Sequence, residues 1–575
     1  MRRTAIALIA LASAVPMTPA ADARVGSQFR SAVSGAHGVV ASESYAASRV
    51  GRAVLEAGGN AADAAAATVF AIGVARPQSC GIGGGGFALY RSATGKVRAL
   101  DFRETAPAAF RRDPLAGPGL HTEFTGHLTV GVPGTLAGMD ALLVRYGTLD
   151  LAEAIAPAEV LARRGFRVPA SLSKAMADNA KRLRLFPASR ARYLLPGDQP
   201  YPAGATLRQP ELGTTLRRIM RDGQSAFYGG PIARAVVRDM RAARPETRDP
   251  GLLTVKDFAA YRAKWRTPVQ GTYRGRRIIG MPPPTSGGIA IIQMLNILQG
   301  FDLGAAAPGS ADALHFMAEA QKIAFADRGA YVADPDFVRV NTPSLISTVY
   351  ADTRRNEIDA RRAKTYGPAL GPPTRPGEST THISVIDAKG AAVAVTCTIE
   401  QEFGSAVVAP GTGFLLNNEL TDFGAPGTAN EPAPGKRPRS SMAPTIVVSP
   451  DGRPELVVGG AGGARIIMGV LQQIVNRVDF GYDIDVALDA ERIDAAAGAG
   501  GRLEIEEARV APDAVAELER RGHRLTRLGQ YAIRPRINAA GVTPPRSRFD
   551  DALRFEAAAD PRTDNGALAA RAPKR

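Results

Sequence analysis

The stretch that decides the fold runs from residue 378 to residue 405 and reads ESTTHISVIDAKGAAVAVTCTIEQEFGS. It contains two runs in which apolar and polar residues alternate, joined by Ala388-Lys389-Gly390. Alternation with a period of two is typical of β-strands, and a short connection that contains glycine is typical of a hairpin. The pattern therefore predicts a β-hairpin centred on residues 388–390.

Further strands and helices are predicted on the carboxyl side of this hairpin. Residues 444–463 read PTIVVSPDGRPELVVGGAGG, which is typical of strands, and residues 465–477 and 511–522 have helical spacing. Strands flanked by helices predict a layered α/β architecture. The Pro- and Gly-rich segment 424–439 is expected to be a surface loop. The last 20 residues are polar and Ala-rich, and their end is expected to fray.

The amino-terminal side is predicted to be mainly helical. Residues 44–75 have the pattern of two helices, and the second is apolar on nearly every face, so it should be buried. A glycine-rich turn over 81–86 and a hairpin turning at Thr94-Gly95 follow it. Residues 150–370 are predicted to be mostly helical with Pro-rich connections.

The first 23 residues are typical of a secretory signal. Arg2 and Arg3 precede an apolar run over 5–15, and Ala21-Asp22-Ala23 provides a cleavage site of small residues. This run is too short to cross the ~30 Å hydrocarbon layer of a membrane, and no later run reaches the ~18 residues that a spanning helix needs. We expect an exported protein, periplasmic or secreted, with no membrane segment once residues 1–23 are removed.

The net charge of +16 would suit an acidic partner. The densest basic stretch, KRLRLFPASRAR at 181–192, lacks the interleaved aromatic residues of a protein that binds single-stranded nucleic acid. A solvated helical face explains it better, and we expect no nucleic-acid partner.

Two common site motifs do not fit. Gly81-x-Gly83-x-x-Gly86 has the spacing of a dinucleotide site, but a helix precedes it and a strand follows, which reverses the order that such a site needs. The six histidines show no H-E-x-x-H spacing, and two cysteines cannot supply a zinc cluster. Export would permit a disulfide, but we expect Cys80 and Cys397 to be separate thiols, and we expect neither a metal nor a cofactor.

Thr380 is the candidate nucleophile. A threonine hydroxyl can attack a carbonyl if a base takes its proton, and the free α-amine of the same residue can be that base. An internal threonine has no free amine, so this chemistry requires cleavage of the chain between Ser379 and Thr380. Standing alone, Thr380 and Thr381 would be ordinary β-branched residues at the start of a strand.

The motifs around this block recur along nearly the whole chain in the order found in one family, and the chain resembles the γ-glutamyltranspeptidases. That resemblance implies an N-terminal-nucleophile hydrolase with an αββα sandwich, matured by self-cleavage into a heterodimer of residues 24–379 and 380–575. The matching motifs are GGNAADAAAA (58–67), PQSCGIGGGGFALY (77–90), DFRETAP (101–107), GVPGTLAG (131–138), MPPPTSGG (281–288), TTHISV (380–385), GFLLNNELTDF (413–423), KRPRSSMAPTIV (436–447), GGAGGARI (459–466) and ADPRTDNGA (559–567).

The resemblance implies four catalytic residues. Thr380 matches the nucleophile that forms a γ-glutamyl ester, and Thr398 matches the threonine whose hydroxyl bonds to it. Gly462 and Gly463 match the pair whose N–H groups form an oxyanion hole. Without the resemblance, Thr398 would be an ordinary strand residue, and the two glycines would form a tight turn after a strand.

The resemblance also implies the binding residues for a γ-glutamyl donor. Arg103 matches the arginine that binds the α-carboxylate, helped by Ser440 and Ser441. Glu419 and Asp422 match the acidic or amide positions that take the α-ammonium. Without the resemblance, Arg103 would be expected in a structural ion pair with a neighbouring acid, and the two acids would be solvated loop charges.

Two departures from the family pattern stand out. Glu400 occupies a position that is usually asparagine, where its carboxylate could still bind an ammonium. The segment between Asp422 and Ser440 is short for members with a lid and has no aromatic residue after Phe423. The balance between hydrolysis and transpeptidation is therefore left open.

The expected activity is γ-glutamyl transfer or glutathione hydrolysis, with a small γ-glutamyl donor and water, an amino acid or a peptide as acceptor. One alternative is a glutaryl or cephalosporin acylase of the same fold, and the acids Glu400, Glu419 and Asp422 argue against it because they suit an ammonium. A second alternative is a non-catalytic basic binding protein, which the joint presence of the expected catalytic residues disfavours.

Overall fold

The two alternating runs pair as antiparallel strands in the computed structural model, which confirms the predicted hairpin. Strand β12 (Ser379–Asp387) pairs with β13 (Ala392–Glu400), and His382 lies opposite Thr396. Every residue of both strands is buried, because other layers cover both faces of their sheet.

The structure describes residues 31–111, 124–241, 250–367, 379–495, 501–543, 553–564 and 566–572. The predicted signal over residues 1–23 lies outside these ranges. Within them, none of the helices combines the length and the apolar character needed to cross a bilayer.

The hairpin lies at the centre of a seven-stranded antiparallel sheet. The second predicted hairpin, turning at Thr94-Gly95, is confirmed as its neighbour. Within the last 20 residues, the backbone of Gly566–Ala569 forms a strand that pairs with that of Val39–Ser42, and the frayed end expected beyond residue 572 lies outside the described residues. In spatial order the strands are β21 (Gly566–Ala569), β2 (Gly38–Ser42), β12, β13, β3 (Gly85–Arg91), β4 (Val97–Phe102) and β9 (Lys264–Arg266).

A second seven-stranded sheet lies against the first. It contains the strands predicted over 444–463, and it also takes β10 and β11 from the middle of the chain, which was predicted to be mostly helical. In spatial order the strands are β1 (Val33–Gly35), β20 (Arg554–Ala559), β19 (Arg536–Thr543), β15 (Pro454–Ala461), β14 (Thr445–Val448), β11 (Arg276–Gly280) and β10 (Val269–Tyr273).

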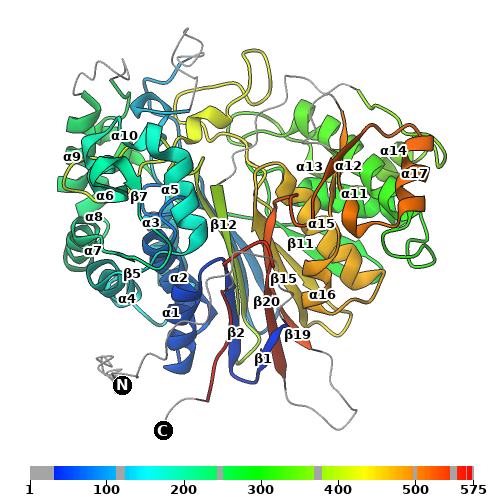
Figure 1. Ribbon diagram of the computed structural model, residues 1–575, viewed down its shortest axis with the longest axis horizontal. Helices are drawn as coiled ribbons and strands as arrows, with labels where there is room; N and C mark the ends of the chain where they lie inside the picture. The colour runs from blue at the N-terminus through cyan, green and yellow to red at the C-terminus, as the bar shows by residue number, and fades with distance from the viewer. Residues whose placement is uncertain are drawn as a thin grey trace.

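Helices from the first half of the chain cover the outer face of the first sheet (Figure 1). The second predicted helix, α2, is buried at 14 of its 15 residues, as its composition predicts, and Asn60 and Asp63 cap its start reciprocally. The basic stretch 181–192 lies on α5 and α6, where Lys181, Arg184 and Arg190 are exposed as expected. These helices are α1 (Tyr45–Glu56), α2 (Ala61–Ala75), α3 (Thr135–Tyr146), α4 (Leu151–Arg164), α5 (Ala170–Leu183), α6 (Pro187–Tyr193), α7 (Pro210–Asp222), α8 (Ser225–Tyr228), α9 (Pro231–Arg241) and α10 (Val255–Ala260).

A second helical layer covers the outer face of the second sheet, on the opposite side of the molecule (Figure 1). It includes the helices predicted over 465–477 and 511–522. Its members are α11 (Gly287–Leu298), α12 (Ala311–Tyr331), α13 (Thr342–Leu345), α14 (Thr348–Arg355), α15 (Arg465–Val478), α16 (Ile484–Asp489) and α17 (Pro512–Arg520). The short strands are β5 (Phe166–Arg167), β6 (Leu194–Leu195), β7 (Gln199–Pro200), β8 (Thr206–Leu207), β16 (Ile493–Asp494), β17 (Leu503–Glu506) and β18 (Leu525–Leu528), and the 3-10 turns are His127–Thr129, Pro196–Asp198, Glu419–Asp422 and Glu507–Arg509.

The four layers enclose two large apolar clusters, as an αββα sandwich requires. Along β13, Val393 and Val395 face the cluster under α2, whereas Ala392 and Ala394 face the cluster between the sheets and α11. The period of two thus sends alternate residues into different cores.

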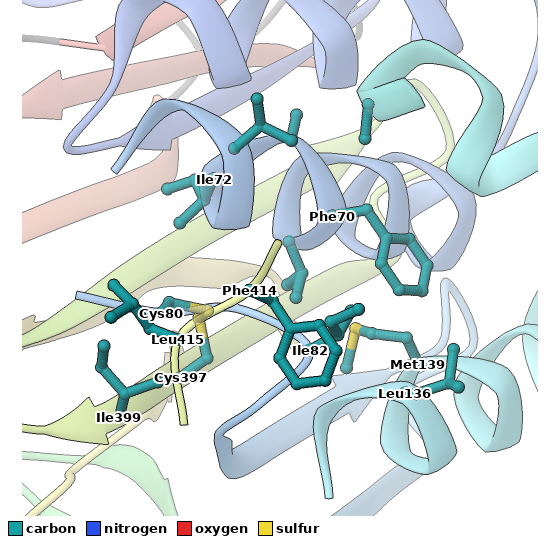
Figure 2. Close-up of a cluster of buried hydrophobic side chains, with 14 of the residues drawn as sticks. Phe70, Ile72, Cys80, Ile82, Leu136, Met139, Cys397, Ile399, Phe414 and Leu415 are labelled. Atoms are coloured by element: carbon teal, nitrogen blue, oxygen red, sulfur yellow. A yellow bond between two sulfur atoms is a disulfide. The ribbon is translucent and has the colours of Figure 1, made fainter. Parts of the chain in front are cut away.

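The expectation of two separate thiols is wrong. Cys80 and Cys397 form a disulfide within the apolar cluster beneath α2, with their Cα atoms 5.6 Å apart (Figure 2). Cys397 lies on β13 opposite Gly86, and Cys80 begins the glycine-rich turn that leads into that neighbouring strand. Strand pairing therefore brings together two residues that are 317 positions apart in the sequence.

Candidate active site

One pocket gathers nearly all the residues singled out in the sequence. Its walls come from β12, β13, the 3-10 turn Glu419–Asp422, the segment before β14, the end of α12 and the start of α15. Gly462 directly precedes a lining residue. The lining residues are Arg103, Arg328, Thr380, Thr398, Glu400, Glu419, Asp422, Arg439, Ser440, Ser441, Met442, Gly463, Ala464 and Ile466.

Hairpin pairing places the two threonine hydroxyls against each other. The Oγ1 atoms of Thr380 and Thr398 are 3.2 Å apart. The Thr398 hydroxyl donates to the carbonyl of Ser379 at 2.7 Å and accepts the N–H of Glu400 at 2.8 Å. Since the single Thr398 proton points at Ser379, Thr380 is left as the donor in the bond between the two hydroxyls.

An irregularity in the pairing lies at the same point. Ser379 lies opposite Glu400 while Thr380 lies opposite Thr398, so Ile399 is an extra residue on β13. Glu400 has φ of 77°, a left-handed conformation that costs a residue other than glycine about 1–3 kcal/mol. Asparagine tolerates this region better than glutamate, so the departure from the family pattern at this position carries a conformational cost.

Gly462 and Gly463 form the turn between β15 and α15. Their φ values are 130° and 59°, and a Cβ on Gly462 would lie 2.4 Å from the carbonyl oxygen of Arg534. A tight turn after a strand therefore explains the glycines. The turn also ends at the start of α15, where free N–H groups and the helix dipole favour negative charge. The oxyanion role stays a prediction that this position supports.

The guanidinium of Arg103 is bonded to protein groups. It pairs with the carboxylate of Glu419, lies 2.6 Å from the carboxylate of Asp422, and also donates to the carbonyls of Pro438 and Arg439. Burial alone would lower the pKa of Arg103, but the charges of Glu419 and Asp422 raise it above its usual value. The residue expected to bind a carboxylate and the residues expected to bind an ammonium thus bind each other.

The acids around Arg103 cannot all be ionised. Burial raises the pKa of Glu104 to about 7, against the effect of the adjacent guanidinium. Burial also raises the pKa values of Glu400 and Glu419 well above the usual range. One guanidinium cannot neutralise these three acids together with Asp422, so the cluster holds protons near neutral pH.

Two arginines of the pocket were missed in the sequence. Arg328 lies in the last turn of α12, a helix whose sequence shows no local sign of a site. Arg439 lies in the segment 424–439 that was expected to be a surface loop. That expectation is wrong for its end, because Lys436, Arg437 and Arg439 are buried. Arg439 is buried because it donates to the carbonyls of Arg328, Gly329 and Val332 at the end of α12.

A separate group of side chains has the composition of a metal site. His315, Glu319 and His523 are buried together, and none of them lines the pocket. His315 bonds to His523 at 2.8 Å and to the carbonyl of Asp359 at 2.9 Å. Glu319 pairs with Lys322 and accepts the hydroxyl of Tyr366. These contacts engage both ring nitrogens of His315 and the carboxylate of Glu319 with other groups of the protein.

Comparison with known proteins gives a consistent result. Residues 47–570 match the family model described as Gamma-glutamyltranspeptidase. The "Glutathione hydrolase proenzyme" of Escherichia coli strain K12 is 42% identical over 519 residues, which cover 86% of this chain and 87% of that protein. The "Acylase ACY 1 proenzyme" of Pseudomonas sp. strain V22 is also 42% identical, over 512 residues that cover 87% of this chain and 89% of that protein.

The similar solved structures also include both an acylase and a gamma-glutamyltranspeptidase. The cephalosporin acylase from Bacillus halodurans superposes with a TM-score of 0.84 at 29% identity, covering 96% of this chain and 100% of that one. A chain of the Helicobacter pylori gamma-glutamyltranspeptidase superposes with a TM-score of 0.53 at 39% identity, and the match covers 56% of this chain and 91% of that one.

Proposed function

The chain belongs to the γ-glutamyltranspeptidase family, and from this premise we propose that it is a self-cleaving threonine hydrolase and transferase of γ-glutamyl amides. The family includes proteins named as glutathione hydrolases and proteins named as acylases, at equal identity to this chain. The choice between these activities therefore depends on the pocket.

Maturation is proposed to begin at the hydrogen bond between Thr398 and Ser379. That bond draws electron density from the carbonyl that Thr380 would attack. Attack by the Thr380 hydroxyl moves the acyl group of Ser379 from nitrogen to oxygen, and water then hydrolyses the ester. The products are a carboxylate on Ser379 and a free amine on Thr380, which give chains 24–379 and 380–575.

The freed Thr380 is proposed to act on donors by the same chemistry. Its amine accepts the hydroxyl proton, the oxygen attacks the γ-carbonyl, and the amine of the leaving group departs with a proton. The N–H groups at Gly462 and Gly463 stabilise the oxyanion. Water or an amine acceptor then releases the γ-glutamyl group from its ester with Thr380.

The observation that carries the γ-glutamyl proposal is the mixed charge of the pocket. Thr380 shares it with the acids Glu400, Glu419 and Asp422 and with three arginines. A γ-glutamyl group ends in an α-ammonium and an α-carboxylate, so it complements both charges. A glutaryl group has the carboxylate alone. We assign the ammonium to the three acids and the carboxylate to the basic side with Ser440 and Ser441, where the family resemblance points to Arg103.

One observation favours an acylase as the second candidate. Arg103 already neutralises Glu419 and Asp422, so the demand of these acids for a substrate cation is smaller than an unpaired cluster would have. The carboxyl group of Glu400, whose Oε2 has no hydrogen-bond partner among the described residues, is buried with a raised pKa, so it would favour a substrate cation only once that cation stabilises its ionised form.

A paired assay with γ-glutamyl and glutaryl anilides separates the two candidates. We expect wild type to favour the γ-glutamyl donor by at least roughly 100-fold in kcat/KM. Glu400→Gln should narrow this ratio, because an amide does not demand a cation. Equal turnover of both donors by wild type would favour the acylase.

Cleavage is tested separately by intact mass and N-terminal sequencing. Wild type should yield a smaller fragment that begins at Thr380, whereas Thr380→Ala should remain one chain. Intact wild-type protein with full activity would rule out the free-amine mechanism. The predicted signal is tested by the N-terminus of the larger fragment, expected near residue 24.

A further inference from the structure

The backbone carbonyl of Thr380 is held by a side chain from the second sheet. Arg536, the first residue of β19, donates from Nη2 to the Thr380 carbonyl at 3.3 Å. Its Nε donates to the carboxylate of Glu43 at 2.8 Å. Arg536 does not line the pocket. It therefore contacts the candidate nucleophile without reaching the space that a donor would occupy.

Glu43 holds the guanidinium of Arg536 from the other side. It directly follows β2 and is fully buried, and its carboxylate also pairs with Arg76 at 3.0 Å. Arg76 in turn pairs with Asp564 at 2.7 Å. A buried charge that loses its partner is costly, so the members of such a chain of ion pairs have few alternative positions. The contact to Thr380 is therefore a fixed one.

This contact fills a gap in the strand pairing of β12. On one side β12 pairs with β13 from end to end, with Thr380 opposite Thr398. On the other side, within the described part of the chain, its pairing with β2 covers only Ser384–Asp387. β2 ends at Ser42, before it reaches the start of β12. Arg536 thus supplies a donor where the neighbouring strand supplies none.

We propose that Arg536 is a positioning residue for the nucleophile, and that its role is greatest after maturation. In the uncleaved chain Ser379 also holds Thr380, because the Ser379 carbonyl accepts from Thr398 and its hydroxyl donates to the carbonyl of Gln78. Cleavage removes this hold and makes Thr380 a chain end. The bond from Arg536 then fixes its carbonyl on the side away from β13, which keeps the hydroxyl aimed at the donor.

The proposed role concerns how Thr380 attacks, not which donor is bound. It rests on the proposed chemistry of Thr380, and it applies equally to a γ-glutamyl and to a glutaryl donor. Loss of a residue that orients only the nucleophile lowers kcat and leaves ligand binding unchanged. Damage to the pocket would weaken binding as well, so the two effects can be separated.

The test compares cleaved wild type with cleaved Arg536→Met in two measurements, the turnover of a γ-glutamyl anilide and the Ki of glutamate as a competitive inhibitor. Arg536→Met should lower kcat by roughly 10- to 100-fold, because a displaced nucleophile loses its attack geometry. The Ki of glutamate should change by less than about 3-fold. Arg536→Lys keeps the charge and a donor but loses the planar fork, so it should recover part of kcat.

Self-cleavage gives a second reading of the same variant. Because Ser379 still holds Thr380 in the uncleaved chain, Arg536→Met should slow cleavage less than it lowers kcat. The measurement is the fraction of cleaved chain over time by intact mass. Equal losses in cleavage and turnover would contradict a role that grows after maturation.

Glu43 provides a test of the chain of contacts. Glu43→Gln weakens the hold on the guanidinium and should lower kcat by up to about 10-fold. Added to Arg536→Met, it should lower kcat no further, because Glu43 acts through Arg536. Glu43→Gln and Arg536→Lys replace Arg536→Met if that variant does not fold.

Arg477→Met is the matched control. The side chain of Arg477 is 10% exposed, against 11% for Arg536, and it likewise pairs with a glutamate, Glu556, at 3.0 Å. It also donates to a backbone carbonyl, that of Tyr482, at 3.1 Å. Arg477→Met should leave both kcat and the Ki of glutamate unchanged.

Failure of this proposal and failure of the proposed function give different results. An unchanged kcat in Arg536→Met overturns the positioning role, and so does a rise in the Ki of glutamate that matches the fall in kcat. Wild type that turns over neither donor contradicts the proposed function and the positioning role with it. Wild type that turns over only the glutaryl donor changes the substrate class alone, and the comparison is then made with that donor and with glutarate as the inhibitor.

Discussion

At the scale of single residues, an acid beside Arg103 should make the stability of the folded protein depend on pH. Glu104 is fully buried, neither of its carboxylate oxygens has a hydrogen-bond partner among the described residues, and burial raises its pKa to about 7. In the unfolded chain the same group has a pKa of roughly 4.3. Between these values the folded protein binds more protons than the unfolded chain, so its stability falls as pH rises.

Replacing Glu104 by glutamine should remove part of this dependence. We expect wild type to lose up to a few kcal/mol of unfolding free energy between about pH 4.5 and pH 7 relative to Glu104→Gln. The measurement is denaturant unfolding across this range in the uncleaved Thr380→Ala background. Glu211→Gln, a change of the same charge on the exposed side of α7, is the control. If the unfolding free energies of wild type and Glu104→Gln changed with pH in the same way, the raised pKa of Glu104 would be contradicted.

Glu400 offers a second residue-scale prediction. Its positive φ suits asparagine better than glutamate, and its carboxyl group is buried. Glu400→Asn should therefore raise the unfolding free energy by about 1 kcal/mol, seen as a higher Tm. Glu400→Gln should gain less, because its longer side chain does not share the preference of asparagine for a positive φ. A lower Tm for Glu400→Asn would show that the Glu400 side chain stabilises the bulge.

At the scale of elements, the sequence predicted those helices and strands whose own residues carry a clear hydrophobic pattern. The alternation over 379–400 predicted the central hairpin, and the apolar character of 61–75 predicted a buried helix. The short strands β10, β11 and β21 were missed. β21 becomes a strand through pairing with the distant β2. β10 and β11 form a local hairpin, but this hairpin joins the sheet through pairing of β11 with the distant β14.

The same limit applied to the site. The resemblance supplied most of the lining residues, but the pairing of Arg103 with Glu419 joins positions 316 apart and left no local signal. Arg328 was missed for a related reason, since it is one charged residue in a long helix and becomes notable only because the fold places it in the pocket.

The cap of α2 tests the element scale directly. Asn60 accepts the N–H groups of Ala62 and Asp63 and also donates to the carbonyl of Tyr146 at 2.8 Å. Asn60→Ala should lower the unfolding free energy by about 1–2 kcal/mol, because buried N–H groups lose their acceptor. Asn60→Asp keeps the cap and loses only the contact to Tyr146, so it should cost less. If both variants lost the same unfolding free energy, the contact to Tyr146 and not the helix cap would provide the stabilisation.

At the scale of the whole molecule, the disulfide and the predicted cleavage point are connected. Cys80 lies before the Ser379–Thr380 bond and Cys397 lies after it. Both sulfur atoms are buried in the apolar cluster of Figure 2, where solvent reductants have little access in the folded state. If the chain is cleaved as proposed, the two products therefore stay covalently joined as well as packed together.

This arrangement predicts how the mature protein behaves on a denaturing gel. After free thiols are blocked with an alkylating agent, cleaved wild type should migrate as one full-length band without reductant and as two bands with it. Cys397→Ser should give two bands under both conditions, because cleavage then leaves no covalent link between the products. This variant should also lose about 2–4 kcal/mol of stability while the chain is uncleaved, since a long loop in the unfolded chain is no longer closed. Two wild-type bands without reductant, with the cleaved N-terminus at Thr380, would show that the cysteines are separate thiols in the mature protein.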